Sequence, residues 1–134
     1  MLVDLAINLF CKDHVRTFEF YRAMLGASEM TEHASPIYRG LQLPGCSLGF
    51  HAQDAYALLD LEDYRNAAPA PGHYPTFNLG STQAVDEMLQ RALALGATLR
   101  KGPFKTYYNA YQVVLLDPEL AVFRLSHYMS DVAS

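Results

Sequence analysis

The sequence has little that would suit a nucleic-acid-binding or membrane-spanning protein. Its 10 Lys and Arg residues form no run and are outnumbered by 14 Asp and Glu residues, which leaves a net charge of −4. A nucleic acid or a membrane surface is therefore not an expected partner. No apolar stretch approaches the length of a membrane span, and no basic segment precedes an apolar run at the N-terminus, so the sequence predicts neither a transmembrane helix nor a signal peptide.

Cysteine is also scarce, and histidine forms no recognisable motif. Cys11 and Cys46 make no CxxC pair and no disulfide framework, which favours the reducing cytoplasm as the location. We expect both thiols to behave as small buried apolar groups. The five histidines contain no HxH, HExxH or His-carboxylate cluster, so no ready-made metal or catalytic motif is present.

What the sequence does contain is enough apolar material for one core, arranged as a repeat. The 134 residues are 51% hydrophobic and 18% charged, a balance typical of one globular domain. Residues 6–10, Ala-Ile-Asn-Leu-Phe, return at 76–80 as Thr-Phe-Asn-Leu-Gly. Residues 25–27, Leu-Gly-Ala, return at the same offset as 95–97. Such self-similarity predicts two copies of one supersecondary unit.

Each copy is predicted to be a strand, an amphipathic helix and three further strands. Alternating residues indicate the first strand at 3–10, with Leu5 and Ile7 facing a helix. The other strands are expected at 28–33, 37–43, 46–51, 74–80, 97–101, 111–117 and 121–128. The Pro-rich segment 67–72 reads as a linker. It would separate module one, about 1–66, from module two, about 73–129.

The helices carry their own start and stop signals. Asp13 is suited to cap a helix that ends near Leu25, where Gly26 supplies a left-handed stop. Val15 begins the apolar stripe of that helix. A second helix is expected over 83–95, capped by Ser81 or Thr82, whereas 55–64 is compatible with helix or strand, with a slight preference for helix.

These features together resemble the vicinal oxygen chelate superfamily, which includes glyoxalase I, the bleomycin-resistance proteins and the extradiol dioxygenases. The resemblance is carried by Asp13, Phe20-Tyr21, Leu25-Gly26 and the segment DPELAVFRL at 117–125. It implies an α+β fold in which two tandem β-α-β-β-β modules form a curved mixed sheet around a cavity. It also implies a small-molecule ligand and a homodimer.

In metal-using members, the resemblance implies four ligands, two from the first and two from the last strands of the modules. Strand parity places Ala6, Gly49, Thr76 and Arg124 at these positions. Alanine and glycine have no ligating side chain, threonine is a poor ligand, and arginine is a cationic donor. The sequence therefore predicts that the metal ligands are lost, and that neither metal nor other cofactor is bound.

The same parity selects candidate ligand-binding residues on the cavity face and its rim. They are Arg124, His51, Asn8, Asn78, Tyr107, Tyr111 and Phe10. A guanidinium fits a carboxylate, amides donate and accept, and tyrosines offer apolar faces with a polar tip. Structural roles remain open for each: Arg124 could pair with Glu62 or Asp63, and the others could serve strand or loop packing.

Three hypotheses follow for function. The first is a metal-free protein of the bleomycin-resistance type that binds a small anionic or aromatic ligand. The alternative is a metal-dependent lyase or dioxygenase with a shifted site, built from His51 with Glu29, or from His73. The third is an interaction module whose cavity is filled by large side chains such as Phe10 and Phe104.

Overall fold

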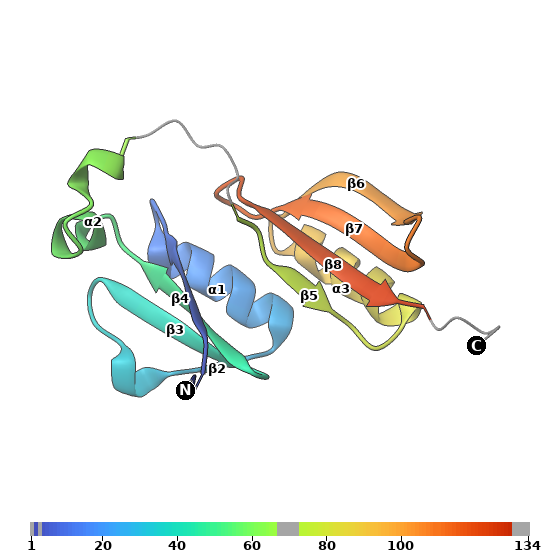
Figure 1. Ribbon diagram of the computed structural model, residues 1–134, viewed down its shortest axis with the longest axis horizontal. Helices are drawn as coiled ribbons and strands as arrows, with labels where there is room; N and C mark the ends of the chain where they lie inside the picture. Colours follow the sequence, from blue (N-terminus) through green and yellow to red (C-terminus); the bar gives the residue numbers. More distant parts are fainter. Residues whose placement is uncertain (1, 3, 67–72, 130–134) are drawn as a thin grey trace. The chain divides into compact units, whose positions relative to one another are not determined.

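The computed structural model describes residues 2, 4–66 and 73–129 of the chain. Contacts divide the chain into two units, residues 1–69 and residues 70–134, and each holds a four-stranded sheet with a helix packed against it (Figure 1). The predicted linker at 67–72 lies outside the described residues. No helix in the described part of the chain is long and apolar enough to cross a membrane.

The first unit is a β-α-β-β-β module followed by short helical turns. Its elements are β1 (Ala6–Phe10), α1 (His14–Leu25), β2 (Ser28–Glu29), η1 (Thr31–His33), β3 (Tyr38–Leu43), β4 (Cys46–His51), α2 (Asp54–Leu58) and η2 (Glu62–Tyr64). The strand order is β1-β4-β3-β2, with β1 parallel to β4 and the other pairs antiparallel.

The second unit repeats this topology. Its elements are β5 (Thr76–Asn78), α3 (Thr82–Ala94), β6 (Thr98–Lys105), β7 (Ala110–Leu116) and β8 (Val122–Tyr128). The order is β5-β8-β7-β6, and β5 is parallel to β8. The predicted α+β class, with two tandem modules, is therefore confirmed.

Both main helices begin at the predicted caps. The Asp13 carboxylate accepts a hydrogen bond from the backbone N–H of Arg16 at 3.1 Å, and the Ser81 hydroxyl accepts one from Ala84 at 3.0 Å. Gly26 ends α1 with φ of 63°, a conformation that costs glycine little. Local signals thus fix where each helix starts and where α1 stops.

Each unit closes its own core between helix and sheet. In the first, Leu48 and Phe50 of β4 are buried, and Phe50 meets Phe18 of α1 edge-on with centroids 5.9 Å apart. In the second, Phe123 and Leu125 of β8 are fully buried on the side of the sheet that packs against α3. The predicted phase of both last strands is therefore confirmed.

Some predicted burial is wrong at the edge of the first sheet. Leu5 and Ile7 are 52% and 41% exposed, and Val15 is 44% exposed. Ile7 is paired with Leu48, so it has the predicted phase, but β1 is an edge strand and α1 packs on β3 and β4 (Figure 1). Alternation along a strand predicts on which face of the sheet each side chain lies, but not how much of that face the helix covers.

Several predicted elements have different bounds, and the strand expected at 74–80 is only Thr76–Asn78. The strand expected at 28–33 is only Ser28–Glu29, followed by the 3₁₀ turn η1. The segment 55–64 is split into α2 and η2. Strand β6 continues to Lys105 where a turn was predicted, because two irregularities in its register carry the strand through Gly102 and Pro103.

Candidate functional site

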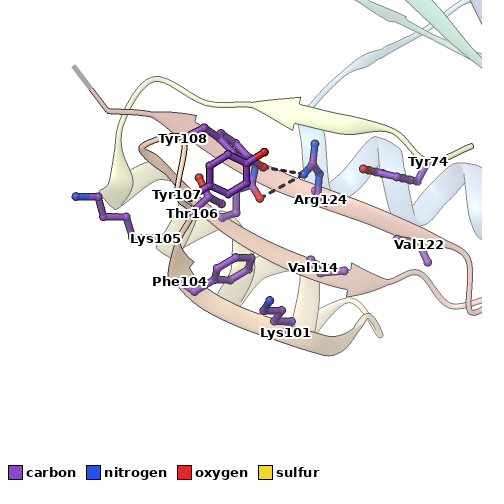
Figure 2. A pocket seen from close by; sticks show the side chains of 11 residues that line it. Tyr74, Lys101, Phe104, Lys105, Thr106, Tyr107, Tyr108, Val114, Val122 and Arg124 are labelled. Carbon is purple, nitrogen blue, oxygen red and sulfur yellow. Dashed lines mark hydrogen bonds between the residues drawn. The ribbon is translucent and has the colours of Figure 1, made fainter. Parts of the chain in front are cut away.

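A pocket of about 600 Å³ lies on the second unit, over the face of the sheet opposite α3 (Figure 2). Its lining combines three cations, four aromatic rings and four smaller side chains, with no carboxylate among these described residues. They are Lys101, Lys105, Arg124, Tyr74, Phe104, Tyr107, Tyr108, Thr106, Gln112, Val114 and Val122.

Register places the pocket residues in rows across the sheet. Thr76 of β5 pairs with Arg124 of β8, Arg124 with Val114 of β7, and Val114 with Lys101 of β6. The next row carries Gln112, paired with Phe104. Because paired residues of neighbouring strands point to the same face, each row presents its side chains together.

Arg124 is held in place by neutral groups. Its Nε donates to Thr76 Oγ1 at 3.0 Å, and its Nη1 donates to Tyr108 Oη and to Gln112 Oε1, both at 3.3 Å. Its guanidinium also lies 5.0 Å from the ring centroid of Tyr74. None of the salt bridges in the described residues involves Arg124.

The structural role considered for Arg124 was an ion pair with Glu62 or Asp63. The Glu62 carboxylate instead pairs with Arg65 at 3.0 Å within the first unit. The Arg124 guanidinium is thus positioned and partly desolvated, and no carboxylate among the described residues of the second unit forms a salt bridge with it.

The Arg124 cation affects the pKa of Tyr108. Burial alone would raise the pKa of its hydroxyl, but hydrogen bonds from Arg124 and Gln112 lower the pKa by more, and the net shift is downward. Tyr107 also lines the pocket, edge-on to Tyr108 with centroids 5.0 Å apart, and its side chain is fully exposed.

Tyr111 lies on the other face of the sheet. Its hydroxyl donates to Asp86 Oδ1 of α3 at 2.6 Å, which raises the pKa of Tyr111. The structure therefore brings Tyr107 and Arg124 together, but it directs Tyr111 toward the helix. Asn78 shares the face of Arg124 through its pairing with Ser126, yet it is exposed and is not one of the lining residues.

The other candidates gather on the sheet of the first unit, opposite α1. Phe10 stacks on Tyr56 with centroids 4.0 Å apart, and His51 lies 5.0 Å from Tyr38. His51 Nδ1 is buried with no hydrogen-bond partner among the described residues. Burial, and then the nearby His14, lower the pKa of His51.

Gly49 is the position on β4 at which a metal ligand of the family was expected, although the register pairs Ala6 with Ser47 and Gly49 with Asn8. A Cβ built there would collide with Asn8 Oδ1 and lie 2.6 Å from the Tyr38 ring, and Tyr38 lies close to Gly40 as well. Asn8 and Tyr38 therefore occupy the space over this part of the sheet.

The residues present do not fit the metal that the fold family uses. The four positions expected from the family resemblance are Ala6, Gly49, Thr76 and Arg124, and Thr76 Oγ1 already accepts a hydrogen bond from the Arg124 guanidinium. No group of three His, Cys, Asp or Glu side chains able to hold a metal occurs among residues 2, 4–66 and 73–129. At the four positions alanine and glycine have no donor, threonine is a poor ligand and arginine is a cation, so these residues do not fit a divalent ion.

The pairing of His51 with Glu29, one form of the shifted metal site, lacks its geometry. Glu29 binds Arg39 at 2.6 Å, and Arg39 lies over the Phe18 ring of α1 at 4.2 Å. Glu29 is therefore on the helix side of the sheet, whereas His51 is on the opposite side. Arg39 also holds the pKa of Glu29 below its ordinary value.

Lys101 was not predicted to line a cavity, and Phe104 was expected only as a side chain that would fill it. Lys101 and Phe104 pair with Val114 and Gln112, which lie on one face, although three positions separate them along β6. Strict alternation would put 101 and 104 on opposite faces, so the irregularities in β6 hide this relation from sequence. The available signal was the Gly102-Pro103 pair, since glycine and proline within a strand often mark a bulge.

Comparison with known proteins agrees with this architecture. The family model described as the Glyoxalase/Bleomycin resistance protein/Dioxygenase superfamily matches residues 5–123, and the chain belongs to this superfamily. The fold is similar to that of a glyoxalase/bleomycin resistance protein/dioxygenase family enzyme from Burkholderia phytofirmans PsJN. That match has 38% identity, covers 95% of this chain and 100% of the other, and has a TM-score of 0.90.

More distant structures share the fold alone. A fosfomycin resistance protein, FosX, from Listeria monocytogenes is 19% identical, with 96% of both chains covered and a TM-score of 0.72. A protein from Agrobacterium tumefaciens is 20% identical, with 97% of this chain and 100% of the other covered and a TM-score of 0.77. No curated protein matches the chain.

Proposed function

We propose that this chain binds a small anionic, partly aromatic molecule in the pocket of its second unit, without a metal held by protein side chains. The observation that carries the proposal is the Arg124 guanidinium, which three neutral acceptors hold at the pocket. A positioned arginine with no carboxylate partner is suited to bind an anion from outside the protein.

The surrounding side chains support the same ligand class. Tyr74, Phe104 and Tyr108 supply aromatic faces against which a flat molecule can pack, and Val114 and Val122 add apolar surface. A few convergent polar groups in an otherwise apolar hollow are typical of small-molecule sites. Such a pocket suits a protein of the bleomycin-resistance type, in which the ligand is held rather than converted.

The metal-dependent lyase or dioxygenase remains the competing function. The Burkholderia relative is described as an enzyme. No donor set among the described residues supports a metal reaction here, because the chelating positions carry Ala6, Gly49, Thr76 and Arg124.

A thermal-shift screen with aromatic carboxylates tests the binding proposal. The best compound should raise the Tm of the wild type and have no effect on Arg124→Ala. Arg100→Ala is the matched control, because Arg100 is an exposed arginine on β6 that does not line the pocket. If no compound stabilises the wild type, or if Arg124→Ala responds as the wild type does, the proposal fails.

We also propose that the chain is a cytoplasmic homodimer. Support for a dimer is the apolar surface beside the edge strand β1, where Leu5 and Ile7 are exposed. Support for the cytoplasm is that Cys11 and Cys46, both described, form no disulfide. In a sedimentation experiment at micromolar concentration, the wild type should have twice the chain mass of 15.0 kDa. Ile7→Lys should have a lower sedimentation coefficient than the wild type. A wild-type monomer would contradict this.

A further inference from the structure

Two cations of the pocket stand on either side of Val114 in one row across the second sheet. Lys101 pairs with Val114, and Val114 pairs with Arg124. Strands in a sheet are spaced about 4.8 Å apart, so the two Cα atoms are roughly 10 Å apart. Figure 2 shows Val114 between the two cationic side chains. The row therefore presents a cation, an apolar floor and a second cation.

The Arg124 end has few N–H groups left for a ligand. A guanidinium has five N–H groups, and those on Nε and Nη1 face Thr76, Tyr108 and Gln112. The N–H groups of Nη2 donate to no acceptor in the described residues. An incoming anion can therefore bind only Nη2, and not two guanidinium nitrogens at once. The Arg124 end of the pocket thus binds a single anionic group.

The Lys101 end has no anion of its own. Its ammonium lies 4.3 Å from the Phe104 ring centroid, and none of the ion pairs in the described part of the chain involves Lys101. Lys105 lines the same pocket but points away from Arg124 (Figure 2). Lys101 is therefore the second cation that a ligand lying across the row would reach.

This concentration of positive charge stands out in a protein with a net charge of −4. Like charges that gather in one hollow repel one another, and an anionic ligand relieves that repulsion. A single carboxylate bound to Arg124 leaves Lys101 unneutralised, because Val114 separates the two ends. A ligand with charge at both ends neutralises both.

We propose that the ligand is a dianion whose two anionic groups are separated by a flat apolar or aromatic middle. One group binds Nη2 of Arg124, the other binds the ammonium of Lys101, and the middle lies over Val114 beside Phe104. This inference rests on the proposed function, since it specifies the ligand of the same pocket.

Matched probes separate this inference from simple anion binding. Benzene-1,4-dicarboxylate and its monomethyl ester have nearly the same shape, but the ester has one charge fewer. Calorimetric titration of the full chain should give at least tenfold tighter binding for the diacid. Lys101→Gln should weaken the diacid to the level of the ester and leave the ester unchanged. Arg124→Gln should weaken both, and the control Arg100→Gln neither.

The outcomes distinguish the two proposals. If diacid and ester bind equally, and both depend on Arg124, the pocket binds anions but the dianion inference is wrong. If Lys101→Gln still binds the diacid more tightly than the ester, by the same factor as the wild type, the dianion inference is also wrong. If neither probe binds, the dianion inference fails, and the proposed function then stands only if the thermal-shift screen yields an Arg124-dependent compound.

Discussion

At the scale of the residue, Arg124 shows what sequence can and cannot reveal about a site. Alternation along β8 was enough to place it opposite the core residues Phe123 and Leu125. Its partners Tyr108 and Gln112 depend on a loop conformation and on the pairing of β7, which no local pattern encodes. The cation was therefore predictable, but the neutral groups that hold it were not.

The link between Arg124 and Tyr108 predicts a pH dependence of anion binding. Burial raises the pKa of Tyr108, but hydrogen bonds from Arg124 and Gln112 lower it by more. The Tyr108 hydroxyl therefore ionises at a lower pH than that of an ordinary tyrosine. The phenolate then competes with the ligand for Arg124, so affinity falls as the pH rises. We expect the affinity of the wild type to fall as the pH rises into the alkaline range and that of Tyr108→Phe to stay constant, as measured by titration.

Tyr111→Phe provides the control, because Tyr111 bonds Asp86 on the helix side of the sheet. Its binding curve should follow that of the wild type. Parallel alkaline losses in Tyr108→Phe and the wild type would show that Tyr108 does not compete for Arg124.

His51 predicts a pH dependence of stability instead. Burial and the nearby His14 lower its pKa in the folded state, so the neutral ring is favoured there. The resulting stability is present above the unfolded value of about 6.5 and is lost as pH falls through the folded pKa. Between pH 7.5 and 5.5, the Tm of the wild type should fall by a few degrees more than that of His51→Phe.

The exposed His73 gives the comparison for this measurement. His73→Phe should lose as much Tm as the wild type over the same interval. Equal losses in all three proteins would contradict a destabilising protonation of His51.

At the scale of the element, caps and periodicity were informative, and irregular strands were not. Asp13 and Ser81 marked the starts of α1 and α3 because capping acts over a few residues. In β6, the irregularities around Gly102-Pro103 brought Lys101 and Phe104 to one face. Whether a glycine and proline turn the chain or bend a strand depends on the partner strand, which lies elsewhere in the sequence.

The sheet of the first unit predicts a steric effect at β4. Gly49→Ala would force its Cβ against Asn8 and the Tyr38 ring, and overpacking of this kind costs about 1–3 kcal/mol in the free energy of unfolding. Urea unfolding measures the loss. Gly80→Ala is the matched control, since no heavy atom lies within 4 Å of the added Cβ, and it should change stability by less than about 0.5 kcal/mol.

A double variant locates the source of that effect. In a Tyr38→Ala background, Gly49→Ala should cost clearly less than it does in the wild type, because the ring no longer occupies the space. Additive losses would mean that Tyr38 does not fill the site over Gly49.

At the scale of the whole molecule, the two units share topology but differ in chemistry. The internal repeat and its strand phases were readable from the sequence, and the family match over residues 5–123 agrees with them. Arg124 pairs with Thr76 as Ser47 pairs with Ala6, so Arg124 corresponds to Ser47 in the two copies. In the first unit Asn8 and Tyr38 crowd the nearby Gly49, whereas in the second unit the arginine stands at an open pocket. That asymmetry could not be read from the repeat, because it depends on how Tyr38 packs and on the irregular β6.

Calorimetric titration of the best aromatic carboxylate into untreated and chelator-treated protein tests the central claim most directly. If Arg124 rather than a metal holds the anion, the two Kd values will agree, and Arg124→Ala will weaken binding at least tenfold. Loss of binding after chelation, restored by adding back one divalent metal, would contradict the account.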